Sequence, residues 1–208
     1  MDIVRGLENE LNLFWCWAGV KIEQFENREI DATLYPNWME VMRLTEEAID
    51  YIENTRNDNL IGSIMIVLGL DNEVENILDK LEKRLSSDVL KVFVSKSIDF
   101  PFYNTRWQIA ELIGRRTECN LERYLVRFLD DENKYVQRRA LLSLVKVNPD
   151  LAVKVSFEKL SDCDEMMRYV SLLTLHELSS ELLEKAVYIL KNDESSLVQG
   201  VLQEINKG

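Results

Sequence analysis

The sequence predicts an all-helical fold built from short helix pairs, and three observations support this prediction. The chain has 208 residues but only seven Gly and three Pro, too few for the many tight turns of a sheet protein. Apolar residues recur at helical spacing through most of the chain. In the second half, a stretch of similar sequence returns every 31 residues, which is typical of a helical repeat protein.

The repeat is clearest in three nine-residue segments that begin at Thr105, Val136 and Met167. They read TRWQIAELI, VQRRALLSL and MRYVSLLTL, and a fourth, degenerate copy covers residues 197–205. Each segment places an apolar stripe on one face of a helix. An aspartate recurs with the same period in the polar turns of the second half, as Asp131, Asp162 and Asp193.

Helices are also expected between these segments and before them. Asn120 and the Asn148-Pro149 pair provide start signals for the helices at 121–129 and 151–160, respectively. We therefore expect one solenoid of about ten to eleven antiparallel helices, with an irregular cap over residues 1–100 and repeats over residues 101–208. The other expected helices cover 2–26, 36–54, 60–69, 72–85, 88–97 and 181–190.

The turn aspartate followed by VQRRALLSL at 136–144 resembles the HEAT family of helical repeats. The resemblance covers about residues 102–208 and implies an α-solenoid of helix pairs that stack because no pair can bury its apolar face alone. It also implies a binding scaffold and not one particular reaction, because HEAT-like repeats serve many unrelated purposes.

Composition argues against several classes of function. The chain lacks an apolar run long enough to span a membrane and has acids at its start, so we expect a cytoplasmic protein without membrane contact. Cys16, Cys119 and Cys163 have no metal-binding spacing and are expected to be buried, and His176 is the only histidine. Without a phosphate loop or a nucleophile motif, we expect no metal, no cofactor and no catalysis.

The net charge of −12 is concentrated near the N-terminus, where residues 1–60 hold 13 acids against 5 Lys and Arg. A field of this sign favours a basic partner and disfavours nucleic acid. We therefore expect a protein-binding scaffold, in particular a cognate inhibitor or immunity-type protein that neutralises a basic partner such as a nuclease toxin.

The first candidate surface is a row of carboxylates on the expected helix 36–54, with an aromatic anchor at its rim. The alternative is that the row is only a solvated helix face. The candidate residues are Tyr35, Glu40, Glu46, Glu47, Asp50 and Glu53.

The second candidate surface is an arginine cluster, because seven of the thirteen arginines lie within residues 106–139. It predicts either a positive groove or ion pairing between repeats. The groove is similar to that of HEAT-like DNA glycosylases that remove alkylated purines, an alternative function that the overall acidity argues against; a generic assembly adaptor is a further alternative. The candidate residues are Arg115, Arg116, Arg123, Arg127 and Arg138.

The segment 11–20 (LNLFWCWAGV) is apolar on almost every side. Such a helix is either enclosed by its neighbours or forms an interface between two copies of the chain. The sequence leaves both alternatives open.

Overall fold

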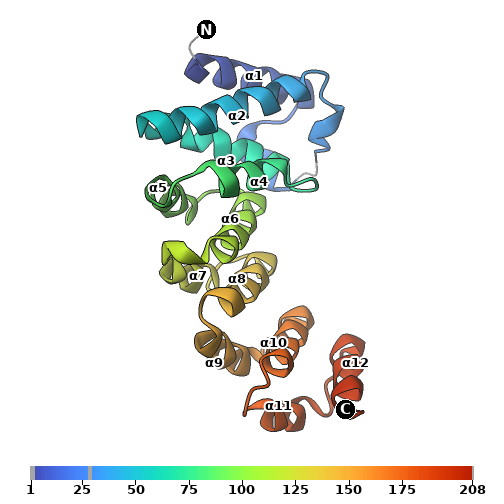
Figure 1. Cartoon of the computed structure of the whole chain (residues 1–208). Coiled ribbons are helices and arrows are strands. Elements are labelled where there is room, and N and C mark those ends of the chain that lie inside the picture. Colours follow the sequence, from blue (N-terminus) through green and yellow to red (C-terminus); the bar gives the residue numbers. More distant parts are fainter. Residues whose placement is uncertain (1–2, 28–29, 208) are drawn as a thin grey trace. The chain divides into compact units, whose positions relative to one another are not determined.

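The computed structural model of the chain describes residues 3–27 and 30–207 and is all-helical over these residues (Figure 1). The described part contains twelve α-helices and four short 3-10 helices but no β-strand, which confirms the all-helical class. Twelve α-helices exceed the ten to eleven expected, and the solenoid arrangement stays a prediction. None of the described helices has the length and apolar character needed to span a bilayer. The chain divides into two compact units, unit 1 (Met1–Leu112) and unit 2 (Ile113–Gly208).

Unit 1 is organised around α2 (Trp38–Thr55), which packs against α1 (Ile3–Ala18), α3 (Ile61–Leu70) and α4 (Asn76–Arg84). The inward side of α2 is the apolar stripe expected from the sequence, with Val41, Ala48 and Ile49 fully buried. The remaining elements are α5 (Ser87–Ser97), most of α6 (Tyr103–Arg115) and the 3-10 helices η1 (Ile22–Asn27), η2 (Ala32–Leu34) and η3 (Asp58–Leu60).

The expected helix 2–26 is wrong, because α1 ends at Ala18. Gly19 has a φ of 64°, a left-handed conformation that Gly adopts without the steric cost other residues incur, and its N–H donates to the carbonyl of Trp15. The chain therefore turns after α1 and continues through η1 and η2 before α2 begins.

The apolar segment 11–20 is only partly enclosed. Leu11 and Phe14 are buried, but Leu13 and Trp17 are 54% and 42% exposed, so burial on every side is not found. Phe14 packs edge-on against Tyr35, with 5.4 Å between ring centroids. The interface between two copies of the chain stays a prediction, and it is confined to the exposed edge that carries Leu13 and Trp17.

Unit 2 is a series of short helices in which each helix from α7 to α10 packs against the next. The even-numbered helices also pack against one another, α8 against α10 and α10 against α12. Its elements are the end of α6, η4 (Thr117–Cys119), α7 (Glu122–Phe128), α8 (Lys134–Val147), α9 (Pro149–Lys159), α10 (Glu165–Glu177), α11 (Leu183–Leu190) and α12 (Ser196–Ile205).

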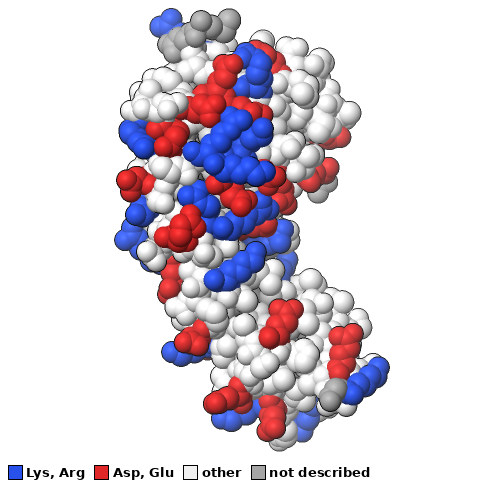
Figure 2. Space-filling view, in the orientation of Figure 1, with Lys and Arg blue, Asp and Glu red and all other residues white. Residues whose placement is uncertain are grey.

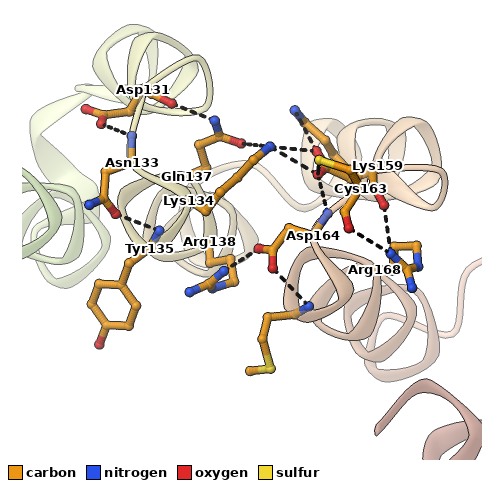
Figure 3. A network of polar contacts seen from close by, with 12 residues as sticks. Asp131, Asn133, Lys134, Tyr135, Gln137, Arg138, Lys159, Cys163, Asp164 and Arg168 are labelled. Carbon is orange, nitrogen blue, oxygen red and sulfur yellow. Dashed lines mark hydrogen bonds and ion pairs between the residues drawn. The ribbon is translucent and has the colours of Figure 1, made fainter. Parts of the chain in front are cut away.

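The 31-residue period of the sequence is also a period of hydrogen bonds. At the start of α6, α8, α10 and α12, a long polar side chain donates to the carbonyl of the residue six positions earlier. These pairs are Arg106 to Phe100 (2.7 Å), Gln137 to Asp131 (2.5 Å), Arg168 to Asp162 (2.9 Å) and Gln199 to Asp193 (2.9 Å). Figure 3 shows two of them, at Gln137 and Arg168.

The repeated aspartates close the turns that precede these helices. The carboxylate of each accepts a hydrogen bond from the backbone N–H two residues later, in Asn133, Asp164 and Ser195. Val136 and Met167, the first residues of their segments, are both fully buried, as this register requires. The fourth segment was placed one residue too early, because Val198 is fully buried whereas Leu197, its expected first residue, is 42% exposed. The sequence period therefore corresponds to a repeated structural unit.

Candidate binding site

The carboxylates expected to form an acidic strip on α2 are paired with cations of the same unit. Arg43 donates to Glu40 (2.6 Å) and also binds Glu47. Arg84 of α4 binds Glu46 at 2.7 Å and Asp50 at 3.1 Å. In the region of Figure 2 where Figure 1 places α2 and α4, blue and red side chains lie next to one another. The α2 row is therefore a network of ion pairs and not a uniformly acidic surface.

Glu46 and Glu53 have further partners beyond their own helix. Burial raises the pKa of Glu46, but hydrogen bonds from Lys80 and Arg84 outweigh it and hold that pKa below its ordinary value. Glu53 accepts hydrogen bonds from the backbone N–H (2.8 Å) and hydroxyl (3.0 Å) of Ser86, the residue before α5. These two carboxylates join α2 to α4 and to the start of α5.

Tyr35 does not form an exposed rim anchor, which corrects the sequence-based expectation. Its side chain is 6% exposed, and its hydroxyl donates to Glu10 at 2.8 Å. Burial and the neighbouring Glu10 raise the pKa of Tyr35 to about 12. The turn after η2 directs the ring inward, where it packs against Phe14 and Trp17 of α1.

Replacing Arg84 with Ala is expected to lower the free energy of unfolding by about 1 kcal/mol, because two partly screened carboxylates of α2 lose their shared partner. Urea denaturation at low and high salt measures this loss. The adjacent Lys83→Ala is the matched control, because Lys83 is more exposed and has a long ion pair with Asp79 (3.6 Å). Equal effects of the two substitutions would contradict a linking role for Arg84.

The arginine cluster of unit 2 is also largely engaged within the unit. Arg116 binds Glu118 at 2.5 Å, and Arg123 lies over the ring of Tyr124. Arg138 binds Asp164, which caps the start of α10 (Figure 3). Arg115 is half-buried, and Arg123 and Arg127 are exposed. Arg138 therefore forms the expected ion pair between repeats, whereas Arg116 pairs within its own turn. No feature of the cluster specifically favours nucleic acid.

The cysteines and His176 lie in different elements of the chain. Cys119 is buried as expected, but Cys16 and Cys163 are exposed, contrary to expectation. His176 lies on the exposed side of α10. Over the described residues, no group of three or more His, Cys, Asp or Glu could hold a metal ion.

Unit 1 contains a cavity of about 630 Å³ that the sequence did not predict. Its walls come from η1 and η2, from the N-terminal end of α2, from the α3–α4 connection and from the start of α6. Four aromatic rings line it, from Phe25, Trp38, Phe102 and Tyr103. Three carboxylates line it as well, from Asp31, Asp71 and Glu73.

The start of α6 is fixed against α3 by buried contacts, and this fixes the aromatic wall. Thr105 donates to the carbonyl of Met65 at 2.7 Å, and Gln108 donates to that of Leu68 at 2.6 Å. A Cβ atom on Gly69 would lie 2.7 Å from the Thr105 hydroxyl and 3.3 Å from the Phe102 ring, so glycine permits this close approach. Phe102 and Tyr103 are therefore held at the cavity by a rigid contact between helices.

Asp71 is the buried carboxylate of the cavity and is only 4% exposed. It follows the last residue of α3, and its Oδ2 accepts a hydrogen bond from the N–H of Ile77 at 2.8 Å. Burial raises the pKa of Asp71 to about 6; backbone hydrogen bonds from Ile77 and Asn76 oppose this, and the nearby Glu75 and Asp79 add to it. Within the described chain, Asp71 forms no ion pair.

Unit 1 is acidic, and the described walls of the cavity hold carboxylates without cations. Residues 1–112 carry 21 Asp and Glu against 11 Lys and Arg. The cavity walls include no Lys, Arg or His among the described residues, and Asp31 and Glu73 form no ion pair there. Seven cations of the unit are instead paired with carboxylates outside the cavity, namely Arg43, Arg56, Lys80, Lys83, Arg84, Lys91 and Lys96.

A scan against protein-family models finds no match, and searches of curated proteins and of solved structures find none at the threshold applied. The resemblance to HEAT repeats therefore rests on the repeat residues alone. Function must be argued from the sites described above.

Proposed function

We propose that this protein is a non-catalytic binding protein that recognises a basic partner protein through the cavity side of unit 1. The observation that carries the proposal is the distribution of paired charges. Carboxylates on α2 have cationic partners in the same unit, whereas Asp31, Asp71 and Glu73 at the cavity have none within the described residues. The cavity carboxylates therefore keep an attraction for an external cation that internal pairing reduces on α2.

The partner is proposed to be a basic protein such as a nuclease toxin, with this chain acting as its cognate inhibitor. A nuclease that grips phosphate groups is basic, and an acidic surface speeds its association through long-range attraction. Unit 2 would serve as a HEAT-like scaffold in this role, because its repeated turns and helix pairs provide a rigid frame. Internal pairing of Arg116 and Arg138 gives the alternative of a DNA glycosylase less support.

Binding of short fluorescent peptides to the full chain, measured by anisotropy, tests this proposal. A Lys- and Arg-rich peptide should bind, its Glu-substituted counterpart should not, and affinity should fall between about 50 and about 300 mM salt. The double variant Asp31→Asn/Glu73→Gln should bind about tenfold more weakly at low salt, because two exposed attractive charges are removed.

The matched control is Glu40→Gln/Glu47→Gln, which changes the charge equally on the α2 face. It should alter affinity by less than about twofold, because Arg43 already neutralises that pair. A loss confined to the α2 variant would place the interface on α2 instead. Failure of every basic peptide to bind would overturn the proposed function, and tighter binding of a short DNA duplex would favour the glycosylase alternative.

A further inference from the structure

The cavity of unit 1 combines features that complement one kind of ligand. Rings of Phe25, Trp38 and Phe102 form an apolar wall, and all three side chains are themselves buried. Asp71 lies at this wall as a buried acceptor, whereas Asp31 and Glu73 are exposed. A ligand that enters between them meets a carboxylate at depth, apolar surface along its length and further carboxylates near solvent.

From this arrangement we propose that the cavity binds an alkylammonium cation, with the ammonium group against Asp71 and its aliphatic stem against the aromatic rings. Ammonium groups are attracted both to carboxylates and to the faces of aromatic rings. A metal ion would fit less well, because the apolar wall offers it no ligands and hard cations require several oxygens. A volume of about 630 Å³ accommodates a flexible diamine or triamine with its stem enclosed.

The second ammonium of a diamine would lie near Asp31 or Glu73. These two carboxylates come from different segments, Asp31 from the N-cap of η2 and Glu73 from the α3–α4 connection. Asp31 accepts hydrogen bonds from the backbone N–H of Thr33 (3.0 Å) and from its hydroxyl, which fix the carboxylate in place. The site therefore favours a cation with charge at both ends over one with a single charge.

An alkylammonium group can come from a free polyamine or from a Lys side chain of a protein partner. The two sources share the same contacts at Asp71. The inference goes beyond the proposed function, because a free polyamine would occupy the cavity even if no basic protein docks on unit 1.

Isothermal titration calorimetry of the full chain tests the inference, with cadaverine and spermidine as probes at about pH 7.5. Each should bind with one molecule per chain, and n-pentylamine, with one charge, should bind about tenfold more weakly than cadaverine. Mg²⁺ at matched ionic strength is the control for unspecific attraction of cations. The neutral 1,5-pentanediol is the control for binding of the aliphatic stem alone. The proposal is overturned if Mg²⁺ displaces cadaverine as effectively as spermidine does.

Asp71→Asn should weaken cadaverine binding at least about tenfold, because the buried charge is removed while an acceptor for the Ile77 N–H is kept. Glu73→Gln should weaken cadaverine binding but leave n-pentylamine almost unchanged. Unchanged cadaverine binding by Asp71→Asn would overturn the proposal. Asp50→Asn, on the α2 face, is the control variant and should bind as the natural chain does.

Competition separates the two sources and the two proposals. If a Lys-containing peptide displaces cadaverine and an Arg-for-Lys peptide does not, the cavity takes a Lys side chain of the partner. If cadaverine binds but no basic peptide does, the cavity site stands as a polyamine site and the proposed function fails. If peptides bind but cadaverine does not, the cavity inference fails and the proposed function stands.

Discussion

Leu172→Ala is expected to lower the free energy of unfolding by about 2–5 kcal/mol, the largest effect of any single change considered for unit 2. Leu172 is fully buried in α10 and belongs to a cluster with Leu160, Leu190 and Val198, which come from the ends of α9 and α11 and from α12. Truncation removes apolar contact with these neighbours and leaves a cavity that they can fill only in part.

Leu141→Ala, one period earlier, is expected to give a loss of similar size, because Leu141 is also fully buried. The adjacent Leu142→Ala is the matched control, since Leu142 is 41% exposed and the same atoms are removed. Chemical denaturation of the three variants compares them directly. A loss for Leu142→Ala equal to that for Leu141→Ala would contradict the assigned register.

Asp71→Asn is expected to raise the free energy of unfolding at pH 7.5 by about 2–3 kcal/mol. The pKa of Asp71 rises from 3.8 to about 6 in the folded chain, chiefly through burial, so the folded state holds the ionised carboxylate at a cost. Asn removes this charge and keeps an oxygen that can accept the hydrogen bond from Ile77. A site that keeps a costly charge is consistent with selection for binding over stability.

The direction of the pH dependence follows from the raised pKa. Because the folded state binds the proton more tightly, the contribution of Asp71 to stability is greatest below about pH 4 and falls as pH rises towards 6. The stability difference between Asp71→Asn and the natural chain should therefore grow across this range and level off above it. Denaturation curves at several pH values measure it.

Asp58→Asn provides a control of opposite sign. A hydrogen bond and the charge of Lys96 hold the pKa of Asp58 below its ordinary value, so its contribution is present at neutral pH and lost on acidification. Asp58→Asn should therefore lower stability at pH 7.5. A destabilised Asp71→Asn variant would mean that the carboxylate's hydrogen bonds outweigh the cost of burying its charge.

The helices of unit 2 could be predicted because local signals agree with packing. Side chains cap the starts of α8, α9 and α10, and Asn148 accepts from the N–H of Leu151 as its position before Pro149 indicates. The start signal expected from Asn120 is wrong, because Asn120 has a left-handed φ of 53° and the N-cap of α7 is Leu121, which has no capping side chain. The period also placed Leu141 and Leu172 inside correctly. The predicted end of helix 2–26 was wrong because the apolar pattern continues past Gly19, where the backbone turns.

The candidate surfaces could not be predicted in the same way, because pairing depends on residues distant in sequence. Arg84 binds Glu46 although the two residues are 38 positions apart in the sequence. No residue pattern on α2 predicts this ion pair. The cavity likewise joins three segments, near residues 25–38, 71–74 and 102–104, none of which carries a motif. One signal was present: Asp71 directly follows the almost wholly apolar helix IGSIMIVLGL, which predicts a buried acid.

The hydrogen bonds from the starts of α8, α10 and α12 to the carbonyls six residues earlier limit how unit 2 can vary in length. Every such bond, and every closing bond of the repeated aspartates, lies within a single period of the chain. Gain or loss of one complete 31-residue segment therefore leaves these turn bonds intact, and the contacts that change include the ion pairs between repeats, Arg138–Asp164 and Arg168–Asp193. An insertion of one residue between Asp162 and Arg168 would instead separate the donor from its carbonyl, so evolution can lengthen this region in whole steps more readily than by single residues.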